Sequence, residues 1–116
     1  MKLSRKEEVL LHLSETPLDH AQEMPLSSCQ QGIRTDLEMS AAACSFVMAE
    51  LESERLVRWK MARVPGLKIR VKTYVLTEKA DELVRMAMAK LELYEKLGSI
   101  ADNFPYQVVL VPRAKD

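Results

Sequence analysis

Apolar residues recur at helical spacing in the first segment of the chain, residues 4–14. One helical face of this segment carries three of them, Val9, Leu10 and Leu13. Ser4 and Glu7 have the spacing of a capping box, in which the two side chains satisfy backbone amides at a helix start. The pattern therefore predicts a helix that ends near Glu15, ahead of Pro17.

Two further helices are predicted close together, over 30–37 and over 41–54. Ser28, with Gln31 three residues later, is expected to open the first of them, and Ser40 is expected to cap the second. The second helix has an apolar face of four residues, Cys44, Val47, Met48 and Leu51. Two short helices with so short a connection are typical of a helix-turn-helix.

The pattern then changes from helical spacing to alternation. Segment 56–63 places basic residues among bulky apolar ones, and 68–74 alternates charged with apolar residues as far as Thr73. The Pro-Gly turn at 64–67 between them predicts a hairpin. Proline and serine residues interrupt segment 16–28 and predict a loop there, with a short strand at Met24–Leu26.

A long helix is expected after the hairpin. Thr77 would cap it, with Glu78 and Asp81 in the first turn, and Gly98 would end it. The chain thus divides into 1–78, the helix 79–98, and a tail 99–116 for which the pattern assigns no role.

The order of elements, with the residues at their junctions, resembles the winged helix-turn-helix regulators, especially small archaeal and MarR-like ones. The resemblance covers roughly residues 5–97 and is carried by Cys29-Gln-Gln-Gly-Ile33, Leu37, Ser40, Ser45, Leu51, Leu56-Val57, Val64-Pro-Gly66 and Tyr74-Val-Leu-Thr-Glu-Lys79. It implies an α+β, mainly helical fold: a three-helix bundle plus a β-hairpin wing, with a long C-terminal helix. It also implies a DNA-binding transcriptional regulator.

Two residues depart from the pattern of those regulators. Glu38 and Arg55 stand where glycine is common, at positions that tend to need left-handed backbone. A different turn geometry is therefore expected at both.

The formal charge is zero, with 17 basic and 17 acidic residues, but the charges are strongly segregated. From Arg55 to Lys72 there are seven basic residues and no acidic one, whereas from Glu7 to Glu54 ten acidic residues face Arg34 alone. A basic hairpin suits contacts to DNA phosphates, although a solvated strand face would also be charged. The predicted phosphate contacts are Arg63, Lys68, Arg70 and Lys72, assisted by Arg58 and Lys60.

The helix 41–54 is the predicted recognition helix in the major groove. Its outward residues are expected to be Ala41, Ala42, Ser45, Phe46 and Ala49, with Ser40 at its start. They include none of the usual readers of base edges, arginine, lysine, asparagine and glutamine, but alanine and phenylalanine can contact thymine methyl groups. The alternative is that Phe46 and its alanine surroundings dock a partner protein.

The last helix carries more apolar surface than one small domain can cover. This surplus predicts a homodimer seam through Leu83, Ala87, Leu91 and Tyr94, the alternative being that the tail folds back over the helix.

Other kinds of chemistry are not indicated. The chain has two cysteines, Cys29 and Cys44, for which buried packing is favoured over a redox role. No catalytic, phosphate-loop or metal-ligand motif occurs, so neither an enzyme nor a cofactor or metal is predicted. No apolar run is long enough for a membrane span, and no signal peptide begins the chain, so a cytoplasmic protein is expected.

Overall fold

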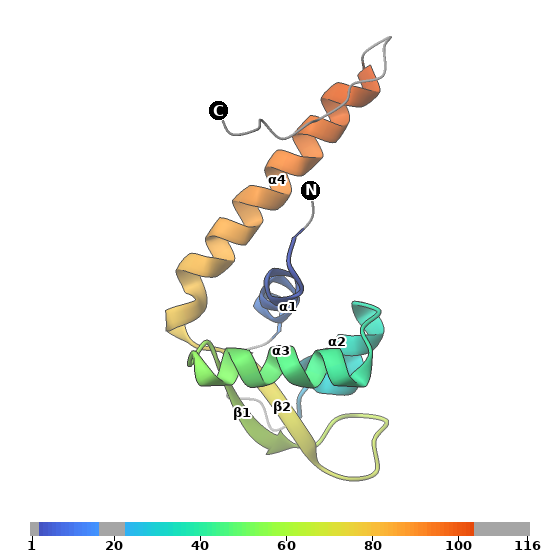
Figure 1. The fold of residues 1–116 in the computed structure, drawn as a ribbon. Coiled ribbons are helices and arrows are strands. Elements are labelled where there is room, and N and C mark those ends of the chain that lie inside the picture. Colours follow the sequence, from blue (N-terminus) through green and yellow to red (C-terminus); the bar gives the residue numbers. More distant parts are fainter. Residues whose placement is uncertain (1–2, 17–22, 104–116) are drawn as a thin grey trace.

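Four helices and one hairpin make up the computed structural model, which describes residues 3–16 and 23–103 (Figure 1). In chain order the elements are α1 (Arg5–Ser14), the 3-10 turn η1 (Leu26–Ser28), α2 (Gln30–Asp36), α3 (Ala41–Ser53), β1 (Val57–Ala62), β2 (Val71–Leu76), the 3-10 turn η2 (Glu78–Ala80) and α4 (Asp81–Asn103). This is the predicted α+β fold of helices, hairpin and long final helix. Most of the predicted tail, 104–116, lies outside the described residues.

The core lies where α1, α3 and the hairpin meet. The apolar faces predicted for α1 and α3 are both buried, and Ile33 of α2 and Tyr74 of β2 are completely enclosed with them. Full burial of one such side chain contributes about 1.5–3 kcal/mol, so these two faces hold the bundle together.

The paired part of the hairpin ends farther from the turn than the alternating pattern predicts. β1 and β2 are antiparallel, with Val57 opposite Leu76 and Ala62 opposite Val71. The second strand therefore begins at Val71, and 68–70 lie in the connecting loop. On the other edge of β1, the Met24 amide donates to the Arg63 carbonyl at 3.0 Å. The strand predicted at Met24–Leu26 is wrong: the isolated bridge to Arg63 is made by Glu23, and η1 begins at Leu26.

Two of the predicted helix caps are confirmed. The Ser4 amide donates to Glu7 Oε1 at 2.8 Å and the Glu7 amide donates to Ser4 Oγ at 3.1 Å, which completes the capping box. Ser40 accepts from the Ala43 amide at 3.1 Å and caps α3.

The first helix ends near Glu15 as predicted, whereas the side-chain caps predicted at Ser28 and Thr77 and the helix end predicted at Gly98 are wrong. The Ser28 hydroxyl donates to the Pro25 carbonyl at 2.7 Å within η1, so α2 starts after Cys29 without a side-chain cap. The Thr77 hydroxyl donates to the Arg55 carbonyl at 2.7 Å, which ties the end of the hairpin to the turn after α3. Gly98 does not stop α4, which continues to Asn103.

Left-handed backbone is kept at both positions where glycine is missing. Glu38 has φ 52° and Arg55 has φ 60°, so the expectation of a different turn geometry is wrong. Each follows a helix whose last carbonyls accept from the chain beyond, as in the 2.8 Å bond from the Met39 amide to the Arg34 carbonyl. These hydrogen bonds stabilise the left-handed backbone, a conformation that is about 1–2 kcal/mol less favourable for a residue with a side chain than for glycine.

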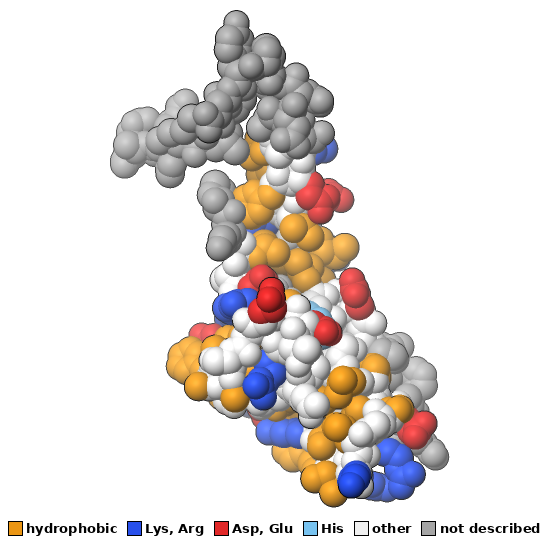
Figure 2. Space-filling model, turned by 90° about the vertical axis from the view of Figure 1, so that its right-hand side faces the viewer, with side chains coloured by type: hydrophobic (Ala, Val, Ile, Leu, Met, Phe, Trp, Pro, Cys, Tyr) orange, Lys and Arg blue, Asp and Glu red, His pale blue; other side chains and the backbone are white. Residues whose placement is uncertain are grey.

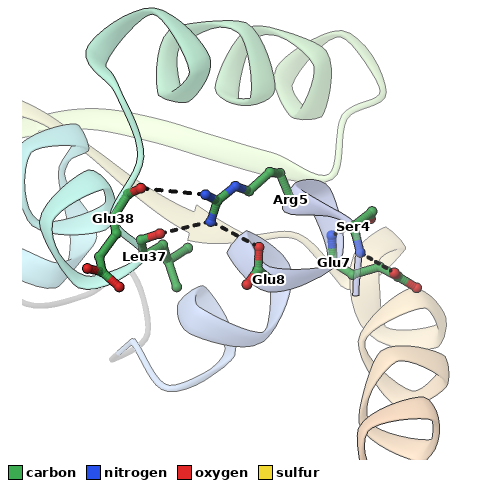
Figure 3. A network of polar contacts seen from close by, with 6 residues as sticks. All are labelled: Ser4, Arg5, Glu7, Glu8, Leu37 and Glu38. Carbon is green, nitrogen blue, oxygen red and sulfur yellow. Dashed lines mark hydrogen bonds and ion pairs between the residues drawn. The ribbon is translucent and has the colours of Figure 1, made fainter. Parts of the chain in front are cut away.

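The turn between α2 and α3 is also fastened from α1. Arg5 donates to the Leu37 carbonyl at 2.8 Å and to the Glu38 carbonyl at 3.5 Å, and pairs with Glu8 at 3.2 Å (Figure 3). A charged donor on carbonyls at a helix end also suits the helix dipole. The placement of α3 thus depends on α1 as well as on its own core face.

α4 leaves the body of the molecule as one long rod, with its first half beside α1 (Figure 1). Ala80 and Ala87 are fully buried against the rest of the chain, and Lys90 reaches Glu7 of α1 at 2.9 Å. None of the described helices is long and apolar enough to cross a membrane.

The contact between α1 and α4 gives a prediction for pH dependence. The Ser4 amide and then the Lys90 ammonium hold the pKa of the Glu7 carboxyl below its ordinary value of 4.5. A lowered folded-state pKa gives stability that is present above about pH 4.5 and lost as the pH falls through the folded-state pKa. Glu7→Gln is therefore expected to be less stable than the native chain at pH 7, with the difference shrinking as the pH falls below 4.5. Urea unfolding at a series of pH values measures this, and a constant difference would contradict it.

Candidate nucleic-acid interface

The outward face of α3 is a small apolar surface. Ala41, Ala42, Ser45 and Ala49 are exposed, as is the capping residue Ser40, and Phe46 is 72% exposed. The opposite face of the helix is the buried one, so the orientation predicted for α3 is confirmed. Phe46 and the alanines around it therefore form a small exposed apolar patch.

A series of hydrogen bonds behind this face fixes the position of one of its residues, Ser45. The Ser45 hydroxyl donates to Gln30 Oε1 at 3.2 Å, and Gln30 Nε2 donates to the Tyr74 hydroxyl at 3.2 Å. Tyr74 is fully buried in the core, so the exposed serine is linked to the interior through α2. Gln30 was not among the predicted site residues, and no local pattern marks it, because both of its partners are distant in sequence.

The cations of the hairpin loop gather at its tip. Arg63 and Arg70 line one hollow together with Glu23 and Met61, and the loop residues 63–70, Lys68 among them, surround a second. All three cations are exposed, and between them Ile69 is 73% exposed. Figure 2 shows blue basic side chains collected beside hydrophobic ones at the end of the molecule away from α4. The structure therefore brings together Arg63, Lys68 and Arg70, as the sequence suggests.

The other three predicted cations lie nearer the base of the hairpin. Lys72 lies 4.4 Å over the Trp59 ring and 3.5 Å from Glu52 of α3, so its charge is already matched within the chain. Arg58 and Lys60 alternate onto the opposite face of the hairpin, which follows from the pairing of Trp59 with Tyr74 and of Met61 with Lys72.

Arg58 lies in a setting of mixed charge. It lines a cleft of about 500 Å³ between α1, β2 and α4, together with the acidic Glu78 and Asp81 and the basic Arg85. The structure thus separates Arg58 from the cations of the tip, and both Arg58 and Lys60 have further interactions within the chain.

Solved structures with the same arrangement are MarR-family regulators. The zinc-responsive MarR family member ZitR of Lactococcus lactis is 24% identical, with a TM-score of 0.64, over 90% of this chain and 65% of its own. ZitR in complex with DNA is 20% identical over 90% and 64% of the two chains, with a TM-score of 0.61. A MepR variant from a multidrug-resistant S. aureus clinical isolate is 20% identical over 83% and 62%, with a TM-score of 0.57.

This chain has the winged helix-turn-helix fold of MarR-family regulators. The resemblance inferred from the sequence is confirmed at the level of the fold. The winged-helix chain spans less than two thirds of the length of the protein in each of these three structures. No protein-family model and no curated protein sequence matches it.

The two cysteines of the winged helix are buried. Cys29 donates to the Leu26 carbonyl at 3.2 Å and Cys44 lies 3.9 Å from the Gln30 carbonyl. Burial raises the pKa of the Cys44 thiol, which disfavours the reactive thiolate. These surroundings agree with the packing interpretation. Within 3–16 and 23–103, no group of three or more histidine, cysteine and acidic side chains is placed to hold a metal.

The predicted dimer seam on α4 needs one correction. Ala87 is fully buried within the single winged-helix chain, so it is not available to a second copy. Leu91 and Tyr94 border a hollow with Leu3. A second apolar stripe is left largely uncovered beside this one, at alternating spacings of three and four residues and interrupted by Lys90: Leu83, Met86, Leu93 and Leu97.

Proposed function

We propose that this chain is a DNA-binding transcriptional regulator of the MarR-like kind. In this proposal α3 lies in the major groove of double-stranded DNA, and the hairpin tip contacts the sugar–phosphate backbone. The observation that carries the proposal is that the exposed face of α3 and the cationic tip belong to a fold whose solved relative ZitR has been captured on DNA.

The charge distribution supports the tip as the phosphate contact. Arg63, Lys68 and Arg70 are exposed and share the hollows of the loop, whereas Lys72 is paired with Glu52. Each phosphate neutralised by such a cation releases condensed counterions, which gives affinity without sequence preference. The proposal therefore assigns the main phosphate contacts to the three tip cations, with Arg58, Lys60 and Lys72 as secondary contributors.

We further propose that two copies bind together, through the uncovered stripe of α4. The alternating spacing of Leu83, Met86, Leu93 and Leu97 suits packing between two helices. A symmetric pair of winged helices would present its two α3 helices about 34 Å apart, one turn of the duplex. Residues 1–78 would then form the DNA-binding unit and α4 the dimerising one.

The proposal is tested by fluorescence anisotropy of a labelled random-sequence duplex, titrated at low and at moderate salt. The expected result is micromolar binding whose log affinity falls linearly with log salt, by about 0.9 for every phosphate contacted. Absence of binding at low salt, where electrostatic attraction is strongest, would reject the proposal and direct attention to a protein partner at Phe46. An apolar protein interface would respond little to salt.

A further inference from the structure

We infer that α3 selects A·T base pairs, through thymine methyl groups and the adenine amino group. This inference rests on the proposed DNA-binding function and specifies the sequences that the site would prefer. It comes from the chemistry of the exposed helix face and from one hydrogen bond behind it.

The exposed face of α3 offers apolar groups to the groove. Ala41, Ala42 and Ala49 present methyl groups, and Phe46 presents an aromatic ring that the rest of the chain leaves 72% exposed. On the major-groove edges of the four bases, the one apolar group is the C5 methyl of thymine. An uncovered phenylalanine in the groove gains from removing that methyl from water, and gains no comparable contact from cytosine or uracil.

Ser45 adds a polar preference that points to the same base pair. Its hydroxyl hydrogen is directed to Gln30 Oε1 at 3.2 Å, and Gln30 is held in turn by the buried Tyr74 hydroxyl at 3.2 Å. With its hydrogen used in this bond, the hydroxyl of the exposed Ser45 can offer only acceptor lone pairs to a partner. Acceptors on the protein match the amino groups of adenine N6 or cytosine N4. Only the A·T pair presents an amino donor together with a methyl group.

The exposed face of α3 has few hydrogen-bond donors that could contact guanine. Guanine presents two acceptors in the major groove, N7 and O6, and is usually read by arginine or lysine donors. Residues 40–54 contain no arginine, lysine, asparagine or glutamine. The acidic residues at the end of α3 are acceptors, and two of them already pair within the chain, Glu52 with Lys72 and Glu54 with Lys6.

Charge complementarity favours a nucleic acid as the occupant of this face over an apolar protein. The tip carries Arg63, Lys68 and Arg70 at the same end of the fold as the hairpin that supports α3. A duplex supplies both the anionic backbone for the tip and the methyl-lined groove for Phe46. A purely apolar protein partner would leave the cations of the tip without counter-charges.

The test uses three duplexes about 20 base pairs long, roughly two helical turns. One alternates adenine and thymine, the second is identical except that deoxyuridine replaces thymine, and the third alternates guanine and cytosine. Replacement of thymine by deoxyuridine removes the methyl group and little else. We expect the thymine duplex to bind more tightly than the deoxyuridine duplex, by about fourfold per methyl group contacted. The guanine–cytosine duplex is expected to bind most weakly.

Two variants assign the effect to the helix face. Phe46→Ala removes an exposed side chain, so the fold should persist, and the ratio of thymine to deoxyuridine affinity should fall toward one. Met88→Ala is the matched control, because Met88 is a comparably exposed apolar residue on α4, 53% exposed, and its variant should keep the native ratio.

The outcomes separate the inference from the function on which it rests. Equal affinity for thymine and deoxyuridine duplexes, with salt-dependent binding retained, overturns the A·T readout and leaves the proposed DNA-binding function standing. An undiminished ratio in Phe46→Ala overturns the role assigned to that residue. Failure to bind any of the three duplexes at low salt overturns both proposals together.

Discussion

Gly32→Ala is expected to destabilise the domain by about 3 kcal/mol, because the structure has no room for a side chain at this position. A Cβ atom built on Gly32 would lie 2.1 Å from the Leu26 carbonyl oxygen and 2.6 Å from its carbon. Both are backbone atoms of η1, which cannot rotate aside as the end of a side chain can. The methyl group would force α2 away from η1 and disturb the Gln30 bridge to α3.

The matched control for this prediction is the same substitution on another helix. A Cβ atom at Gly98 of α4 would meet nothing within 4 Å, so Gly98→Ala is expected to be neutral or to stabilise by about 0.5–1 kcal/mol. Urea unfolding midpoints, compared at unchanged slope, measure both variants. If Gly32→Ala unfolded within about 1 kcal/mol of the native chain, α2 and η1 would have to be more loosely packed than described.

Removal of the three tip cations is expected to weaken binding to every DNA sequence by on the order of a hundredfold at low salt. The variant carries Arg63→Gln, Lys68→Gln and Arg70→Gln, all exposed positions that leave the core untouched. The slope of log affinity against log salt should become shallower by about 0.9 for each phosphate that is no longer neutralised. Preference among sequences should change little, since these residues contact the backbone in the proposal.

A control with the same net charge tests whether position matters. Lys79→Gln, Arg85→Gln and Lys96→Gln remove three exposed cations from η2 and α4, away from the tip. Anisotropy titrations at several salt concentrations compare the two triple variants with the native chain. Equally weakened binding in both would mean that only total charge matters, and native affinity in the tip variant would remove the hairpin from the interface.

Local sequence patterns predicted the features that depend on near neighbours. The Ser4 and Ser40 caps, and the division of α3 into a buried and an exposed face, follow from spacings of three and four residues. One incorrect prediction, the side-chain cap at Thr77, has a different cause, a partner far along the chain. Thr77 binds the carbonyl of Arg55 and does not cap its own helix.

The candidate site was predictable to the same extent and for the same reason. The exposure of Phe46 follows from helix geometry, and the clustering of the tip cations follows from the turn at Gly66. The pairing of Lys72 with Glu52 and the bridge through Gln30 depend on how α2, α3 and β2 pack together. Charge counting along the sequence therefore identified the loop where exposed cations gather, but it did not reveal that Lys72 is paired with Glu52.

The buried residues and the exposed residues of α3 form two separate sets. Cys44, Val47, Met48 and Leu51 are buried and hold the helix in place, while Ala42, Phe46 and Ala49 are exposed. Exchanges at such exposed positions usually change stability by no more than about 0.5 kcal/mol. If α3 reads DNA as proposed, the domain could be changed toward new target sequences by substitutions on the outer face of α3, while its folding stays nearly constant.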